Sequence, residues 1–324
     1  MATITYREAI SGALHEALQA DSKVFLMGED IGDYGGSYAV TKGFLKEFGP
    51  DRIRDMPIAE SVIVGTGIGA AMGGMRPVVE LMTINFSLLA LDQIVNIAAK
   101  IHYMSGGQIT VPLVIRTVSG GGNQLAASHS QSLEGWFASM PGLRVAVPAT
   151  PYDARGLLRT ALKDNNTTIF VEHSLLYPLK GEVPDDWYTV PFGKAEVKRQ
   201  GKDVTIVSYL RMTQVALRAA ERLAQEHGIE AEVVDLRTLR PLDVEAAVES
   251  VKKTNKCIVV EETWRTGGFG AEVVGQIQEA AFDFLDGPVM RVAGKDVPMP
   301  YARKLEQAAI PSEDDIIRAV KAPA

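Results

Sequence analysis

Val24-Phe-Leu-Met-Gly-Glu-Asp-Ile-Gly32 is the stretch from which the fold of this chain is predicted. Its first residues are apolar without alternation, and they end at a glycine followed by two acidic residues. A short apolar run with such a boundary is typical of a strand that is buried on both faces of a parallel sheet. Glu29 and Asp30 would then lie at the carboxyl edge of the sheet, where ligands bind, although solvated loop acids are equally common there.

Similar apolar runs recur along the chain and alternate with helical patterns, the first of which follows a capping box formed by Thr5 and Glu8. Further strands are expected at residues 77–81, 111–118, 144–147, 168–171, 204–209, 232–236, 257–261 and 289–292. Helices are expected at residues 9–18, 61–74, 86–104, 212–227, 244–252, 271–285 and 314–321, with another beginning after Thr150-Pro151. Because strands apolar on both faces alternate with helices, the predicted fold class is α/β with doubly wound parallel sheets.

The periodicity fails between Ser174 and Lys202, where Pro178, Pro184 and Pro191 predict a surface linker. A chain of 324 residues is also too long for one ordinary hydrophobic core. We therefore expect two α/β domains, at residues 1–188 and 189–324.

The composition excludes several classes of protein. The net charge is −7 and the charges are interspersed, so no nucleic-acid-binding surface is predicted. No apolar run approaches the roughly eighteen residues of a membrane span, and residues 1–9 do not resemble a secretory signal. Cys257 is the single cysteine and lies in an apolar run, which predicts an inert buried thiol and a reducing, cytoplasmic location.

Gly65-Thr-Gly-Ile-Gly-Ala70 matches the dinucleotide-binding pattern G-x-G-x-x-G/A, so a nicotinamide-dependent dehydrogenase is a rival prediction. The motif lies inside a longer run of small residues, whereas the fingerprint requires a turn between a strand and a helix. The acidic residue expected about twenty positions later is also missing, since Glu80 comes too early and Asp92 lies in a helical pattern. We favour a helix whose glycines permit close packing.

Two side chains are candidates for chemistry. Glu60 opens the small-residue helix, where the helix dipole favours a carboxylate, so capping and catalysis both explain it. His129 lies among small polar residues just after Gly120-Gly-Gly122, and a histidine on a mobile loop suits proton transfer. The patterns G-x-S-x-G, HExxH, CxxC and the P-loop are absent, so classic hydrolase, zinc and NTPase activities lose their usual support.

Several short motifs, each weak alone, occur together in a specific order. They are Gly28-Glu-Asp-Ile-Gly32, Asp55-Met-Pro-Ile-Ala-Glu60, His129-Ser-Gln-Ser132, Pro141-Gly-Leu143, Thr150-Pro-Tyr-Asp-Ala154, Val233-Val-Asp-Leu-Arg237, Pro241-Leu-Asp243, Val260-Glu-Glu262 and Gly267-Gly-Phe-Gly270. Over essentially its whole length, the chain resembles the beta subunits of the pyruvate dehydrogenase decarboxylase component, in the transketolase-like superfamily. The resemblance implies a pyrimidine-type thiamine-diphosphate-binding domain followed by a transketolase C-terminal-like domain.

The resemblance also implies roles for individual residues. Glu60 matches the carboxylate that activates thiamine diphosphate through a ring nitrogen, and Glu29, Ile58 and Phe86 match positions that line the pyrimidine pocket. His129 matches a histidine that assists proton movement and acyl transfer to lipoamide. Relatives also hold a structural potassium ion, at positions that correspond to Leu113, Ala161, Leu162, Asp164 and Asn166.

The diphosphate-binding half of such a site is missing here, because the chain has no GDG motif. The resemblance implies that an alpha subunit supplies this half together with Mg²⁺, so the chain would be active only in an α2β2 heterotetramer. In many relatives the C-terminal domain docks the subunit-binding domain of the dihydrolipoyl acyltransferase. Two beta chains should also meet, with residues 65–74 as a plausible contact.

The expected reaction is oxidative decarboxylation of pyruvate with acetyl transfer to a lipoyl group, as in acetyl-transferring pyruvate dehydrogenases. Beta subunits of branched-chain 2-oxoacid dehydrogenases and of acetoin dehydrogenases share these motifs and stay open as alternatives. A non-catalytic scaffold that only recruits the acyltransferase is the rival from a different class, and the presence of Glu60 and His129 argues against it.

Overall fold

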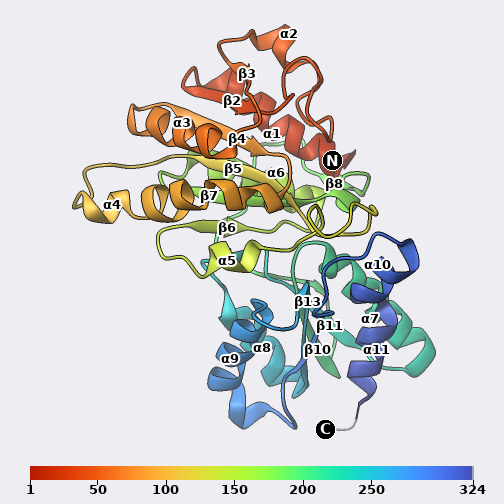
Figure 1. Cartoon of the computed structure of the whole chain (residues 1–324). Coiled ribbons are helices and arrows are strands. Elements are labelled where there is room, and N and C mark those ends of the chain that lie inside the picture. Colours follow the sequence, from red (N-terminus) through yellow and green to blue (C-terminus); the bar gives the residue numbers. More distant parts are fainter. Residues whose placement is uncertain (323–324) are drawn as a thin grey trace. The chain divides into compact units, whose positions relative to one another are not determined.

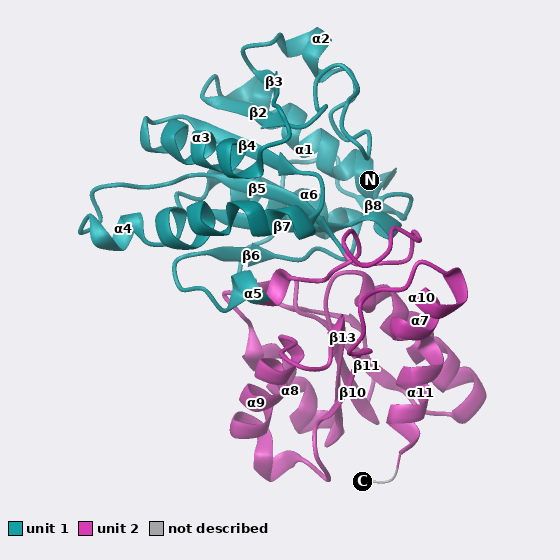
Figure 2. Ribbon diagram, in the orientation of Figure 1, with its two compact units in different colours: residues 1–119, 136–192 teal, residues 120–135, 193–324 magenta. Residues whose placement is uncertain are grey.

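The computed structural model describes residues 1–322, which form two compact units. Unit 1 contains Met1–Ser119 and Trp136–Phe192, and unit 2 contains Gly120–Gly135 and the chain from Gly193 onward (Figure 2). The chain enters unit 2 for the last time at Gly193. The sequence patterns did not indicate that residues 120–135 belong to unit 2, and the domain boundary at residues 188 and 189 stays a prediction.

Unit 1 is built on a parallel sheet. Its strands are β2 (Val24–Gly28), β3 (Ile53–Asp55), β4 (Arg76–Leu81), β5 (Val114–Ser119), β6 (Arg144–Ala146) and β7 (Thr168–His173). Within the unit they follow the order β6-β7-β5-β4-β2-β3, and each neighbouring pair is parallel. Every residue of β2, β5 and β7 is buried, as expected for strands that are covered on both faces.

Helices cover the sheet of unit 1 on both sides. They are α1 (Tyr6–Ala20), α2 (Phe44–Phe48), α3 (Glu60–Met72), α4 (Ile101–Met104) and α6 (Pro151–Lys163), while α5 (Glu134–Ala138) lies where the chain returns from unit 2. Figure 1 shows α3 in front of the sheet and α1 with α6 behind it. The two predicted starts are confirmed, because Thr5 forms a capping box with Glu8 before α1 and Thr150 accepts the Asp153 N–H before α6.

The long helix predicted at residues 86–104 is wrong. The structure has a 3₁₀ helix at Ile84–Ala90, a π-helical segment at Gln93–Ala98 and then α4, with a bend of 71° between Ile84–Ala90 and Gln93–Met104. Apolar spacing alone does not separate 3₁₀, α and π turns, because their periods are similar. Among residues 1–322 no single helix has the length and apolar character to cross a membrane, and only this bent pair passes that test jointly.

Unit 2 has a second sheet with the order β14-β13-β10-β11-β9, parallel except for the antiparallel β9 at its edge. The strands of unit 2 are β9 (Glu196–Arg199), β10 (Val204–Ser208), β11 (Ala231–Asp235), β12 (Thr238–Arg240), β13 (Cys257–Trp264) and β14 (Met290–Gly294). Its helices are α7 (Arg211–His227), α8 (Val244–Thr254), α9 (Gly270–Ala281), α10 (Arg303–Ala309) and α11 (Glu313–Lys321). Helix α7 packs with α11, and α8 packs with α9 (Figure 1). The predicted α/β class is therefore confirmed in both units.

The predicted linker between Ser174 and Lys202 is more ordered than expected. It contains a 3₁₀ turn (Ser174–Leu176), β8 (Lys180–Val183) and β9. Strand β8 pairs with β1 (Ala2–Thr5), and β9 pairs with β11. Both strands have four residues and depend on partners distant in sequence, so local patterns did not predict them.

Cys257 is the first residue of β13 and is buried, as predicted. Burial raises the pKa of its thiol to about 12. A thiol with so high a pKa carries almost no thiolate near neutral pH and is therefore inert.

Candidate active site

Three neighbouring strand ends define the candidate site in unit 1. Strand β2 lies between β3 and β4, and all three run in parallel, so their carboxyl ends share one edge of the sheet. Glu29 follows β2, Glu60 follows β3 through a four-residue connection (56–59), and Phe86 follows β4. The topology therefore brings together side chains that are far apart in sequence, at the edge where parallel sheets bind ligands.

Glu29 and Glu60 form a buried pair of carboxyl groups. Their exposed fractions are 7% and 3%, and the two side chains are close enough to interact electrostatically. Burial is the main cause of a raised pKa for Glu29, followed by the negative charge of Glu60. The Oε1 atom of Glu29 is buried and makes no hydrogen bond. A buried polar atom of this kind fits a site that receives a polar ligand.

Glu60 is the first residue of α3, as predicted from its position. Ala59 provides no side-chain cap, so Glu60 is the acidic group closest to the positive end of the helix dipole. This geometry satisfies the structural role considered for Glu60. Its second neighbour in the site is Glu29, whose pKa is raised first by burial and then by the charge of Glu60.

Asp55 supports the loop that carries Glu29. Its carboxylate accepts hydrogen bonds from the backbone N–H groups of Gly32 at 2.6 Å and Asp33 at 3.3 Å. A side chain at position 32 would lie 2.7 Å from the Asp55 carboxylate, so the close approach requires glycine. The sequence patterns had given Asp55 no role, because the contact joins the ends of two different strands.

The glycines of α3 do not form a dinucleotide site. Gly65, Gly67 and Gly69 all lie within the helix, whereas the fingerprint needs a turn between a strand and a helix. A Cβ atom on Gly67 would lie 2.8 Å from Val79 of β4, so this glycine permits close packing of the helix on the sheet. The structure therefore supports the packing interpretation and removes the main argument for a nicotinamide-dependent enzyme.

Apolar side chains around this edge are unusually exposed. Ile58, one of the predicted pocket residues, is 82% exposed, and Phe86 is half-buried. Tyr34 and Leu89 of unit 1 are 73% and 65% exposed. Exposed apolar residues that gather at one site are typical of a surface covered by a ligand or a partner.

A buried network of charged side chains lies on β4, β5 and β7, next to the strand that Glu29 follows. Arg116 on β5 donates to both oxygens of Glu172 on β7, at 2.7 and 3.0 Å, and to Glu80 on β4 at 2.6 Å. The Tyr177 hydroxyl donates to Glu172 at 2.8 Å. Glu80 lies opposite Gly28 in the sheet, immediately before Glu29. Burial of Glu80 is the largest cause of its raised pKa, although Arg116 acts in the opposite direction.

His129 lies in unit 2 rather than with Glu60 in unit 1. Its side chain is exposed, and its Nδ1 atom is 3.0 Å from the Ser128 hydroxyl. The loop around it has no regular secondary structure and is closed by a hydrogen bond from Gly120 N–H to the Gln131 carbonyl at 3.1 Å. The small, polar setting predicted for this histidine agrees with these contacts, and the mobility of its loop stays a prediction.

The positions expected for potassium lie near the end of α6 and the starts of β5 and β7. The carbonyls of Leu162 and Asp164 accept hydrogen bonds from Arg76 at 3.0 and 2.6 Å. The carbonyls of Leu113 and Ala161 accept backbone N–H groups, and Asn166 donates to the Asp164 carboxylate. Each carbonyl has a second lone pair, so the oxygen chemistry fits a cation, although Arg76 already brings a positive charge. Within residues 1–322, no three His, Cys, Asp or Glu side chains form a metal-binding group.

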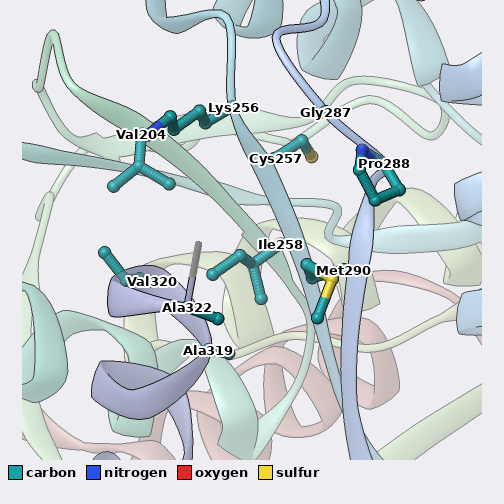
Figure 3. A pocket seen from close by; sticks show the side chains of 10 residues that line it. All are labelled: Val204, Lys256, Cys257, Ile258, Gly287, Pro288, Met290, Ala319, Val320 and Ala322. Atoms are coloured by element: carbon teal, nitrogen blue, oxygen red, sulfur yellow. The ribbon is translucent and has the colours of Figure 1, made fainter. Parts of the chain in front are cut away.

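A small pocket of unit 2 contains none of the predicted site residues. Its volume is about 50 Å³, and Figure 3 shows the residues that line it, including Val204, Cys257 and Met290. These three stand at or next to the first residues of β10, β13 and β14. Ligand sites of parallel sheets lie at the opposite, carboxyl edge. Its size and its position therefore separate this pocket from the candidate active site.

Comparisons with known proteins give a separate family match for each of two regions of the chain. Residues 2–180 match the transketolase pyrimidine binding domain, and residues 193–316 match the transketolase C-terminal domain. A solved structure described as "Split gene transketolase, inactive beta4 tetramer" aligns with a TM-score of 0.80 and 27% identity, over 98% of this chain and 97% of that chain.

Curated relatives extend the similarity over almost the full length. The mitochondrial pyruvate dehydrogenase E1 component subunit beta-2 of Oryza sativa subsp. japonica is 49% identical over 322 residues, 98% of this chain and 85% of that protein. The pyruvate dehydrogenase E1 component subunit beta of Rickettsia felis is 47% identical over 318 residues, 98% of this chain and 97% of that protein. The chain therefore belongs to the family of pyruvate dehydrogenase E1 component beta subunits.

Proposed function

We propose that this chain supplies the beta half of a thiamine-diphosphate-dependent active site that oxidatively decarboxylates pyruvate and transfers the acetyl group to a lipoyl group. The observation that carries this proposal is the buried Glu29–Glu60 pair at the carboxyl edge of the sheet in unit 1. It lies within the part of the chain that matches a pyrimidine binding domain. The full-length relatives are named as pyruvate dehydrogenase subunits, which favours pyruvate.

The residues at the sheet edge fit the aminopyrimidine ring of thiamine diphosphate. When bound, this cofactor supplies the ylid that attacks the carbonyl carbon of the substrate. Glu60 would hold a proton at a ring nitrogen, and Phe86 and Ile58 would contact the flat face and rim of the ring. The buried, unpartnered Oε1 atom of Glu29 would meet a polar group of the ligand.

Glu29 influences the proton movement proposed for Glu60. Because its pKa is raised, Glu29 keeps a proton to a higher pH than an exposed glutamate does. A protonated Glu29 carries a hydrogen-bond donor that a carboxylate lacks, and this donor would lie beside the side chain of Glu60. Glu60 can then accept or share the proton of an aromatic nitrogen, which is the proton movement that cofactor activation requires.

A second polypeptide would complete the site. The chain has no GDG motif for a metal-bound diphosphate, and Ile58, two residues before Glu60, is 82% exposed. We therefore assign Mg²⁺ and the diphosphate to an alpha subunit in an α2β2 assembly. The exposed Val62 and Met72 on α3 fit a contact between two beta chains. The solved neighbour named as an inactive β4 tetramer supports both a beta–beta contact and the inactivity of beta chains alone.

Three further assignments belong to the same proposal. The oxygen atoms at the end of α6 would bind a structural K⁺, because helix carboxyl ends attract cations. Unit 2 would dock the subunit-binding domain of a dihydrolipoyl acyltransferase. The single, buried cysteine fits a reducing compartment such as the cytoplasm.

His129 would assist proton movement and receive the lipoyl-bearing partner. Its exposure on an irregular loop suits contact with a separate protein. Branched-chain 2-oxoacids and acetoin remain the alternative substrates. Turnover of all three by the complex with its alpha subunit would identify the correct one.

The test of the proposal is Glu60→Gln, assembled with the alpha subunit. Glutamine keeps the size and much of the hydrogen bonding but cannot exchange a proton, so CO₂ release from pyruvate should fall roughly a thousandfold. Assembly, followed by sedimentation, should be unchanged. Glu279→Gln, on the exposed side of α9, is the matched control and should keep full activity. Near wild-type turnover of the Glu60 variant would refute the assigned role.

A further inference from the structure

The loop that carries His129 is tied to unit 2 through its backbone. It follows β5 of unit 1 in sequence, yet residues 120–135 belong to unit 2. The loop closes on itself between Gly120 and Gln131, and the Thr263 hydroxyl donates to the Ser132 carbonyl at 2.8 Å. The structure therefore fixes the base of the loop to β13 of unit 2.

Glu306 is the main anchor of the exposed part of this loop. It lies on α10, and only 1% of its surface is exposed. Its carboxylate accepts hydrogen bonds from the backbone N–H groups of Gly122 at 2.9 Å and Gln124 at 3.0 and 3.2 Å. Hydrogen bonds to a buried carboxylate are stronger than those between neutral groups, so this contact is unusually firm for an irregular loop.

Glu262 is a second anchor at the adjacent residue. Its carboxylate accepts a hydrogen bond from the Gly121 N–H at 2.8 Å, and Arg211 donates to its other oxygen at 3.1 Å. A Cβ atom at position 121 would lie 3.1 Å from Ile310 and 3.2 Å from Met299, so glycine allows the backbone to reach the carboxylate. Two acidic side chains thus accept hydrogen bonds from three backbone N–H groups of the loop, those of Gly121, Gly122 and Gln124.

The conformation between these anchors and His129 needs such support. Gln124 and Ala126 have φ angles of 58° and 63°, in the left-handed region that residues other than glycine rarely adopt. The His129 N–H in turn donates to the Ala126 carbonyl at 3.3 Å. Glu306 binds Gln124, Ala126 continues the strained segment, and His129 follows, so the position of the histidine depends on the anchor.

We propose that Glu306, assisted by Glu262, is a positioning residue that sets the conformation of the His129 loop for acyl transfer to the lipoyl-bearing partner. The catalytic part of this inference rests on the function proposed above for His129. Neither carboxylate touches substrate or cofactor in this proposal. Both act only through the backbone of residues 121–124.

Hydrogen exchange of the assembled alpha–beta complex tests the anchoring without any assay of activity. Glu306→Ala should increase the exchange rates of the amides of Gly122 and Gln124 at least roughly tenfold, because these two amides lose their acceptor. Glu306→Gln, which keeps one acceptor oxygen, should give an intermediate increase. Glu279→Ala, at an exposed position, should match the wild type. Wild-type exchange in both Glu306 variants would overturn the proposal.

Kinetics of the two half-reactions test the consequence. In Glu306→Ala, acetyl transfer to a free lipoyl domain should fall about tenfold, and CO₂ release should fall less. The reason is that displacement of His129 slows most the step in which this histidine acts. Glu306→Gln should restore part of the transfer rate. The variant His129→Ala/Glu306→Ala should transfer no more slowly than His129→Ala, since Glu306 acts through His129.

The outcomes separate the two proposals. A loosened loop with wild-type acetyl transfer would overturn the catalytic part of this inference, while anchoring by Glu306 would stand and His129→Ala would test the function of the histidine separately. An equal loss in both half-reactions, with unchanged exchange at Gly122 and Gln124, would assign Glu306 to the general stability of unit 2 and overturn the inference.

Discussion

The two candidate catalytic groups are held in opposite ways. In unit 1, Glu60 and Glu29 are buried at the ends of parallel strands and are backed by the network of Arg116, Glu80 and Glu172. In unit 2, His129 is exposed on a loop without regular structure, and buried carboxylates hold only the backbone of that loop. In unit 1 the catalytic side chains themselves are buried and held, whereas in unit 2 only the backbone of the loop is held.

This difference matches the tasks proposed for the two sites. A group that shares a proton with a cofactor ring has to stay in one position, and a sheet edge provides that rigidity. A group that meets a separate, lipoyl-bearing protein must be accessible, which requires an exposed loop. Backbone anchoring limits the freedom of such a loop without burying its histidine. The comparison leads to three predictions, ordered here by the size of the expected effect.

The largest effect is expected where the rigid site is disrupted. Arg116→Met leaves Glu172 and Glu80 buried without their cation, and breaking a buried ion pair costs about 3–5 kcal/mol. A loss of that size lowers the melting temperature by roughly 10 °C in a domain of this length. Calorimetry of the assembled enzyme measures it.

Arg222→Met is the matched control. Arg222 forms exposed ion pairs with Glu226 and Asp314 on unit 2, and such pairs contribute about 0–1 kcal/mol. Its melting temperature should stay within about 2 °C of the wild type. If the two variants behaved alike, the network around Arg116 would not be the rigid support of the acidic pair.

The next effect concerns the exposed His129 of unit 2. His129→Ala should slow acetyl transfer to the lipoyl domain about a hundredfold, because a positioned acid–base group contributes that much or more. Decarboxylation should be affected no more than transfer, and stability should not change, since the side chain is exposed. His227→Ala, at the end of α7, is the matched control. Full rates in both half-reactions would make His129 a bystander.

Much of the fold was predictable because its signals are local. Apolar runs predicted the buried strands β2, β4, β5 and β7, and the patterns at Thr5 and Thr150 predicted two helix starts. The break at residues 84–104 was not predictable, because the apolar spacing suits more than one helix type. Strands β8 and β9 were missed because they exist only through pairing with distant strands.

The candidate site was predictable in its residues but not in its contacts. The position of Glu60 at a helix start and of Glu29 at a strand end followed from local patterns, yet their proximity requires the strand order β4-β2-β3. Charged residues inside apolar runs were the available signal for Glu80, Arg116 and Glu172. Glu306 had no local signal, because its partners lie more than 180 residues away in sequence.

The smallest effect is the pH dependence of the acidic pair. The pKa of Glu29 is raised above its ordinary value of 4.5, so between these two values the native state binds more protons than the unfolded state. The stability that Glu29 contributes is therefore present at low pH and lost as the pH rises through the raised pKa. Glu29→Gln cannot titrate, so the melting temperature of this variant should rise relative to that of the wild type as the pH increases from 4.5 through the raised pKa of Glu29.

Glu8→Gln provides a comparison of opposite sign. The Thr5 backbone N–H and hydroxyl lower the pKa of Glu8, so its contribution is present above the ordinary value of 4.5 and is lost as the pH falls through the lowered pKa. The melting temperature of the wild type should therefore fall relative to that of Glu8→Gln as the pH becomes acidic. Relative to Glu29→Gln, the melting temperature of the wild type should fall as the pH rises. A constant difference between Glu29→Gln and wild type across this range would mean that the pKa of Glu29 is not raised in the native state. The rigid site would then lose the property that distinguishes it from the exposed histidine of unit 2.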